Sequence, residues 1–199
     1  LPFTRLAAGS WHTCGVLGGG YGGQIACWGD SVGVGNPGAL YSHADSVCFW
    51  APACTPQPVL GPALTGASQI TAGDSHTCAL ASQGLRCWGD NEVLQLGAAG
   101  GWAGATVLVP LPNDVVVSLN AGSFHTCALL QTGAAWCWGA TALDSTGYPA
   151  WEGKSPAVVP VDGRFIALSA GGWHTCAITA KGRLFCWGLN WGGSLGNGS

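Results

Sequence analysis

Four short apolar runs are spaced along the chain, and each leads into the dipeptide Ala-Gly. Within these runs, alternation of apolar and polar residues and the β-branched content are typical of β-strands. The runs cover residues 1–8, 67–73, 115–122 and 165–171. We therefore expect four β-strands, each stopping at a glycine corner.

A hairpin is predicted behind each of these strands. In the second case its arms are residues 78–81 and 84–88, joined by a turn at Ser82-Gln83. The corresponding turns at 131–133 and 180–182 contain a glycine, which supplies the positive φ that tight hairpin turns need. Because the chain also holds 34 glycines and 11 prolines, long helices have little room. The pattern predicts an all-β protein.

The same residues recur in every hairpin. Each unit has His-Thr-Cys on its first arm and Cys-Trp-Gly on its second, and the histidines are His12, His76, His125 and His174. A spacing near 50 residues is the signature of a repeat architecture. Such a unit cannot bury its apolar face alone and must stack on its neighbours.

The repeats divide one repeat domain, residues 1–199, into four units. Their expected ranges are 1–57, 58–108, 109–157 and 158–199. The first unit is the longest because it carries an inserted loop at 41–57. In each unit a loop after Cys-Trp-Gly and a proline-flanked segment lead on to the next strand. The chain contains no Met and no leader at Leu1, so we expect a mature or internal segment.

Ten cysteines accompany the repeats, eight of them inside the four hairpins. Directly opposed residues of an antiparallel pair lie about 4.5–5.5 Å apart at Cα, which suits a disulfide. The expected pairs are Cys14–Cys27, Cys48–Cys54, Cys78–Cys87, Cys127–Cys137 and Cys176–Cys186. This density indicates an oxidising, extracellular compartment. The alternative is a set of reduced, buried thiols in a cytosolic protein.

Tryptophans fall into two groups. Trp28, Trp88, Trp138 and Trp187 recur with the repeat and are expected in the core. Loop aromatics are candidates for a surface that contacts a protein or a sugar face, although packing on a neighbouring unit is the competing interpretation. These candidates are Phe49, Trp50, Trp102, Trp151 and Trp191. Asn197-Gly198-Ser199 is a possible N-glycosylation sequence.

Charge and motifs exclude several function classes. Only 8% of residues are charged, Lys and Arg total six and the net charge is -3, so nucleic-acid binding is not expected. No apolar run reaches 18 residues, so no membrane insertion is expected.

The four histidines do not suggest a metal site, and we expect each to hydrogen-bond backbone within its own unit. Gly73-Asp74-Ser75-His76 looks like a hydrolase motif, but the residue before the histidine varies between units. We expect no catalytic residues, no cofactor and no enzyme activity.

The units resemble the repeats of the regulator of chromosome condensation family. The second unit carries the pattern through Ala72-Gly73, His76-Thr77, Trp88-Gly89, Asn91 and Leu96-Gly97, and the fourth unit carries the same pattern. The resemblance implies a β-propeller, which in that family usually has seven four-stranded blades. Four units would form a partial propeller, either a fragment of a longer chain or an arc completed by another segment or copy.

The cysteine pairs are closer to the extracellular relatives, such as the ectodomains of crinkly-type plant receptor kinases. The nucleotide-exchange activity of the founding member is therefore not expected here. We expect an extracellular structural or adhesive scaffold that contacts other proteins, with copies of itself among them in a surface filament or coat. The alternatives are a glycan-binding propeller and an enzyme-regulating binding domain.

Overall fold

The computed structural model describes the chain except for residues 31–53, 100–104, 142–153, 162 and 199. The described residues form antiparallel β-strands and two short 3₁₀ turns, η1 (Gly19–Tyr21) and η3 (Trp191–Gly193). The strands are β1 (Phe3–Ala8), β2 (His12–Leu17), β3 (Ile25–Asp30), β4 (Cys54–Leu60), β5 (Gln69–Ala72), β6 (His76–Ala81), β7 (Gly84–Gly89), β8 (Val107–Leu108), β9 (Val116–Ala121), β10 (His125–Leu130), β11 (Ala135–Gly139), β12 (Lys154–Val158), β13 (Phe165–Ala170), β14 (His174–Thr179) and β15 (Leu184–Gly188).

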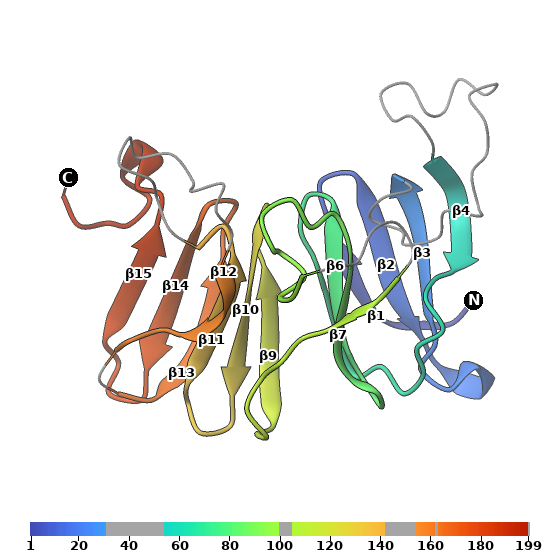
Figure 1. The fold of residues 1–199 in the computed structure, drawn as a ribbon, viewed down its shortest axis with the longest axis horizontal. Helices are drawn as coiled ribbons and strands as arrows, with labels where there is room; N and C mark the ends of the chain where they lie inside the picture. Colours follow the sequence, from blue (N-terminus) through green and yellow to red (C-terminus); the bar gives the residue numbers. More distant parts are fainter. Residues whose placement is uncertain (31–53, 100–104, 142–153, 162, 199) are drawn as a thin grey trace.

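These strands make four sheets in chain order. The sheets are β1–β4, β5–β8, β9–β12 and β13–β15, and within each the strands follow one another as a meander. The first strands β1, β5, β9 and β13 contact one another in succession, so the sheets radiate from a common side. Figure 1 shows them standing in a row from the N-terminal to the C-terminal end. This is the open arc of propeller blades expected from the repeats, and we call the sheets with their loops blades 1 to 4.

The hairpin registers place the cysteines opposite each other, as predicted. Cys14 faces Cys27 across β2 and β3, and the other three hairpins repeat this pairing. The outer strands β4, β8 and β12 come from the proline-flanked segments that the sequence analysis treated as connections. Because β4 pairs with β3 and ends at Leu60, blade 1 extends past the unit boundary expected at residue 57.

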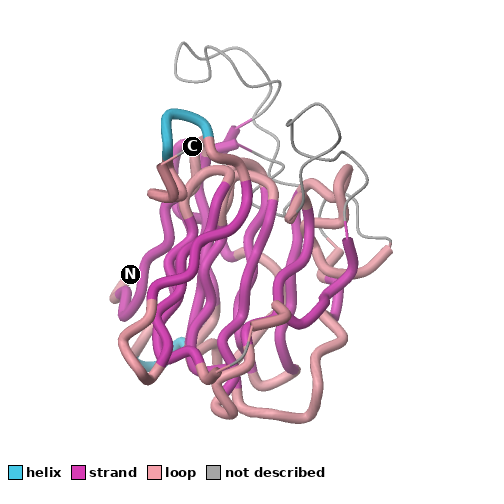
Figure 2. Tube along the Cα trace, turned by 90° about the vertical axis from the view of Figure 1, so that its left-hand side faces the viewer, coloured by secondary structure: helices cyan, strands magenta, loops and turns pink. Residues whose placement is uncertain are grey.

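The apolar core lies between neighbouring blades. Three clusters each combine residues from two successive blades. Between blades 2 and 3, for example, Cys78 and Leu85 pack with Leu119 and Trp138. Figure 2 shows the strands running between the two ends of the molecule where the loops gather. Stacking of blades is therefore what removes the apolar side of each sheet from water.

Candidate functional site

The repeated His-Thr-Cys triplet forms a joint between successive blades. In three of the four triplets, the histidine Nε2 atom lies within hydrogen-bond distance of a threonine Oγ1 in the following blade. These contacts are His12–Thr77 at 2.6 Å, His76–Thr126 at 2.8 Å and His125–Thr175 at 2.8 Å. The expectation that each histidine bonds backbone in its own unit is therefore wrong for these three. Strand alternation turns the histidine toward the next blade and the threonine toward the preceding one.

The contacts determine which ring nitrogen of these imidazoles carries the proton. Within the described residues the Nδ1 atoms of His12, His76 and His125 are buried without a hydrogen-bond partner. A neutral imidazole has a single N–H group. Here that group finds an acceptor only if the proton is on Nε2, from which it is donated to the threonine hydroxyl. The threonine hydroxyl in turn points to a disulfide sulfur of the preceding blade, as with Thr126 Oγ1 and Cys78 Sγ at 3.8 Å.

Burial keeps the joint histidines neutral. Removal from water, together with a smaller effect of repulsion from His12 and His125, lowers the pKa of His76 to about 3. Burial likewise lowers the pKa of His12 and His125 to about 4. At neutral pH none of the three carries a charge, which suits a role in blade packing.

A disulfide lies directly behind each joint. Four of the expected bridges are present, each with a Cα–Cα distance of 4.1 Å: Cys14–Cys27, Cys78–Cys87, Cys127–Cys137 and Cys176–Cys186. The first three are buried against the next blade. Cys48 of the expected pair Cys48–Cys54 falls outside the described residues. Each blade hairpin is thus closed covalently on the side that faces its neighbour.

Glycines let the blades approach at the joint. A Cβ on Gly73 would overlap both the carbonyl oxygen of Gly122 in the next blade and the ring of His76. The residue after this glycine donates its backbone N–H to the next blade, as in Asp74 N to Ser123 O at 3.1 Å and Ser123 N to Gly172 O at 2.8 Å. The Ala-Gly corner is therefore a close backbone contact, where a larger residue has no room.

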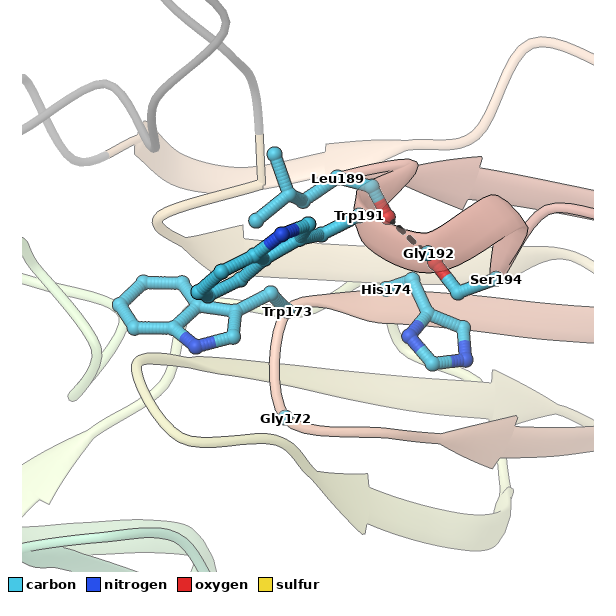
Figure 3. Close-up of a pocket in the computed structure, with 7 residues that line it drawn as sticks. All are labelled: Gly172, Trp173, His174, Leu189, Trp191, Gly192 and Ser194. Carbon is cyan, nitrogen blue, oxygen red and sulfur yellow. Dashed lines mark hydrogen bonds between the residues drawn. The ribbon is translucent and has the colours of Figure 1, made fainter. Parts of the chain in front are cut away.

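An aromatic patch surrounds a surface pocket on blade 4. The pocket encloses about 460 Å³ and is lined by Gly172, Trp173, His174, Leu189, Trp191, Gly192 and Ser194. Figure 3 shows the indoles of Trp173 and Trp191 beside Leu189, with His174 on the other side. Trp173 also stacks on Phe124 of blade 3, with ring centroids 4.7 Å apart. We call Phe124, Trp173, Leu189 and Trp191 the aromatic rim.

The structure places only part of the expected binding surface. Trp191 is 83% exposed, as a candidate contact residue requires. Phe49, Trp50, Trp102 and Trp151 lie outside the described residues. Sequence analysis missed Trp173, because it treated the variable position before the histidine as scaffold. The signal was present in the aromatic side chains at this position in three of the four units, Trp11, Phe124 and Trp173.

The remaining expected positions are structural or exposed. Trp88 and Trp138 are fully buried, and Trp138 Nε1 donates to Gln95 O of the preceding blade at 3.0 Å. Asn197 is exposed, and its Oδ1 accepts a hydrogen bond from Asn190 Nδ2 at 3.1 Å. Ser199, the last residue of the glycosylation sequence, is not among the described residues.

Two kinds of site were sought among the described residues and not found. No three His, Cys, Asp or Glu side chains gather closely enough in this part of the chain to hold a metal ion. No helix in the described ranges is long and apolar enough to cross a membrane.

Comparison with known proteins identifies the repeats. The family model of the regulator of chromosome condensation (RCC1) repeat matches residues 67–95, 116–141 and 165–190. No protein of curated function matches the chain.

Solved structures share the fold. Prp20p from Saccharomyces cerevisiae, whose structure was described with its binding to Gsp1p and histones, has a TM-score of 0.70 and 23% identity, over 99% of this chain and 48% of its own. Human WBSCR16 has a TM-score of 0.72 and 19% identity, over 99% and 50%. The ectodomain of receptor kinase CR4 from Physcomitrella patens has a TM-score of 0.57 and 28% identity, over 94% and 39%.

The chain thus spans about half the length of the solved structures that it resembles. The family model finds its repeats in blades 2, 3 and 4. Blade 1 has the same His-Thr-Cys and Cys-Trp-Gly residues and the same joint geometry. The resemblance drawn from the sequence is confirmed: blades 2, 3 and 4 contain RCC1 repeats, and the four blades are arranged as part of a β-propeller.

Proposed function

We propose that this chain is an extracellular scaffold module that binds other proteins and has no catalytic activity of its own. The observation that carries the proposal is the disulfide in every described blade, which in blades 1 to 3 lies in the hairpin that packs against the next blade. Such bridges form and persist in oxidising compartments. The likeness to the receptor-kinase ectodomain of Physcomitrella patens, at 28% identity, supports the same location.

The aromatic rim is the surface that we assign to partner binding. Trp191 is almost fully exposed, and beside it Trp173 and Leu189 line an open apolar pocket. Exposed tryptophan next to a pocket is the side-chain type that most often dominates the energy of a protein interface. The expected partner presents an apolar or aromatic side chain that enters this pocket.

Binding of proteins is also what the solved relatives suggest. Prp20p, the yeast RCC1, was studied for its binding to Gsp1p and histones, and the same protein was solved bound to Kap60. We carry over only the use of a propeller surface as a protein-binding platform. Disulfide-closed blades argue against carrying over the nuclear partners.

The location is tested by counting thiols in the native protein. The protein is alkylated without reductant directly after isolation and analysed by mass spectrometry. We expect the cysteines of all four described bridges to stay unmodified. Free thiols at these positions in the native protein would contradict an extracellular scaffold.

The binding surface is tested by exchange of Trp191. Photo-crosslinking to extracellular proteins on intact cells is compared for the unmodified chain, Trp191→Ala and the matched control Tyr21→Ala, since Tyr21 is 40% exposed in blade 1. Loss of a hot-spot tryptophan weakens binding by about 30-fold or more. Equal crosslinking of the Trp191→Ala and Tyr21→Ala proteins would exclude the rim.

A glycan ligand is the second candidate, because two indoles border the same pocket together with the Ser194 hydroxyl. Tryptophan rings can stack on sugar faces. Titration of tryptophan fluorescence with a glycan panel distinguishes the two. A saturable change that is absent in the Trp191→Ala protein supports the lectin, and no change with any sugar removes it.

A further inference from the structure

The hairpin turns of the four blades gather at one end of the molecule. They cover residues 18–24, 82–83, 131–134 and 180–183, and they lie along the lower edge of Figure 1. We call this the turn end. The Ala-Gly corners and the loops after Cys-Trp-Gly lie at the other end, which we call the corner end.

The two ends differ in charge. Among the described residues, Asp114 is the one acid at the turn end, whereas the corner end holds Asp30, Asp74, Asp90, Glu92 and Lys154. The turn end holds the other five of the six Lys and Arg residues of the chain. These five are Arg5, Arg86, Arg164, Lys181 and Arg183, and we call them the basic surface. The net charge of -3 therefore conceals a local excess of positive charge.

Two arginines of the basic surface lie where blades 1 and 2 meet. Arg5 Nε donates to Ser68 O, just before β5 of blade 2, at 2.6 Å. Arg86 is opposed to Ala79, which packs in the core between these two blades, and its Nε donates to Gln83 O at 3.4 Å. Because these acceptors are neutral carbonyls, both guanidinium groups keep their charge and still have N–H groups to offer a ligand.

The other three cations lie on the side where blades 3 and 4 meet. Arg164 donates from Nη2 to Gln131 O of blade 3 at 2.8 Å. The guanidinium of Arg183 lies 5.0 Å from the ring centroid of Phe185, which packs on the core between these blades. Lys181 is exposed in the turn of blade 4. The basic surface thus consists of two groups, one at each of two blade contacts.

The exposure of the basic surface does not depend on the ends of the chain. Its four arginines lie at contacts between two described blades. Thr132, which takes the place of Lys181 in the turn of blade 3, is exposed although blade 4 follows it. Further blades on either side of the arc would therefore leave the basic surface open.

Uncharged polar side chains separate the two groups of cations. Ser82, Gln83, Gln131 and Thr132 are exposed in the turns of blades 2 and 3. Packed sheets lie about 10 Å apart, so two blade spacings place the groups about 20 Å from each other. A small anion can reach only one group. A ligand that uses both must carry several anionic groups along its length and bond the hydroxyls and amides between them.

We propose that the turn end binds a linear acidic polysaccharide, whose carboxylate or sulfate groups contact the basic surface and whose hydroxyls bond the polar turns. The guanidinium fork suits the paired oxygen atoms of such anions. A nucleic acid would need aromatic platforms for its bases, and Tyr21 is the one exposed aromatic residue described at this end. The inference adds a second surface to the proposed scaffold and rests on its extracellular location.

Asp114 opposes such a ligand. Its carboxylate accepts hydrogen bonds from the Thr132 hydroxyl and the Val115 N–H, both at 2.7 Å. The bond from Thr132 is the main cause that lowers the pKa of Asp114, so this carboxylate is ionised at neutral pH. Asp114→Asn should therefore strengthen the binding of a polyanion.

Fluorescence anisotropy of labelled polysaccharides tests the proposal. The oxidised chain is titrated at pH 7 into dextran sulfate, alginate and neutral dextran, in about 0.1 M and about 1 M salt. We expect saturable binding of dextran sulfate, alginate or both at the lower salt, and none of dextran. Binding should be lost at the higher salt, because the screening length falls from about 10 Å to about 3 Å. The polymer that binds identifies sulfate or carboxylate as the preferred group.

Lys181→Gln and Lys154→Gln form a matched pair, because they remove the same charge from opposite ends of the molecule. Lys181→Gln should weaken binding about three- to fivefold, the range for an exposed ion pair, and Lys154→Gln should leave it unchanged. Adding Arg5→Gln to Lys181→Gln removes a cation from the second group and should weaken binding again by a similar factor. All these side chains are exposed, so circular dichroism should show that the variants are folded.

Three results would overturn the proposal. One is no binding of either acidic polysaccharide at the lower salt. Another is equal affinity of the Lys181→Gln and Lys154→Gln proteins. The third is stronger competition by polyglutamate or a thymidine oligonucleotide than by the unlabelled polysaccharide, which would assign the turn end to an acidic protein or a nucleic acid. Each would leave the scaffold function standing if the cysteines are oxidised, whereas free thiols would remove that function itself.

Discussion

Thr126→Val removes one inter-blade hydrogen bond and leaves the shape of the side chain almost unchanged. Thr126 is fully buried, and its hydroxyl contacts His76 Nε2 at 2.8 Å and Cys78 Sγ at 3.8 Å. In the variant the His76 N–H has no acceptor, and the Nδ1 atom of the same ring is already without a partner in the described residues. A buried donor left unsatisfied costs about 1–3 kcal/mol.

The assay is urea unfolding followed by tryptophan fluorescence at pH 7, with the free energy of unfolding taken from the midpoint and slope. We expect Thr126→Val to lower that free energy by about 2 kcal/mol. Thr13→Val is the matched control, because Thr13 occupies the same position in blade 1 and no described histidine faces it. Its expected effect is within about 0.5 kcal/mol. If the two substitutions lowered the free energy of unfolding equally, the inter-blade hydrogen bond between His76 and Thr126 would be refuted.

Other predictions follow from the same contacts. Gly122→Ala should lower the free energy of unfolding by about 3 kcal/mol, because its Cβ would meet the Gly171 carbonyl and the His125 ring. Urea unfolding measures this, and Gly20→Ala, with open space around its Cβ, should have little effect.

Replacing both Cys127 and Cys137 by Ser should lower the same free energy by about 2–3 kcal/mol, the loop entropy of a bridge spanning 10 residues, and an unchanged urea midpoint would contradict this. The free energy of unfolding should also decrease as the pH is lowered. The joint histidines have a lower pKa folded than unfolded, so between pH 6.5 and about 4 the unfolded chain binds more protons. Each histidine should then remove ~1.4 kcal/mol per pH unit, and equal urea midpoints at pH 7 and pH 5 would argue against buried neutral rings.

Local features of the fold were predictable from the sequence. The strand before each Ala-Gly and the two hairpin arms follow from alternation and turn residues, and these fix which cysteines oppose each other. The short outer strand β8 was not predictable, since Val107–Leu108 is too short to show a period. It is a strand because β7 presents hydrogen-bonding groups beside it.

The partner of each histidine was also beyond a local analysis. His76 bonds a threonine 50 residues further along the chain, and nothing near His76 in sequence indicates which blade it faces. The repeat period identifies the partner, because each of these histidines lies one repeat before the threonine that it bonds. Trp191 of the aromatic rim was expected from the sequence, but its neighbour Trp173 was missed, because the two indoles meet only after blade 4 folds.

The most direct test of the account is a long-range ¹H–¹⁵N NMR spectrum of the histidine rings, recorded at pH 7 and again at pH 5. The account predicts that His12, His76 and His125 carry one proton, on Nε2, at both pH values, because burial lowers their pKa values to about 3–4. Thr126→Val should shift the His76 signals and leave those of His12 in place. Protonation of these three rings with midpoints near 6.5, or a proton on Nδ1 at pH 7, would contradict the inter-blade joint.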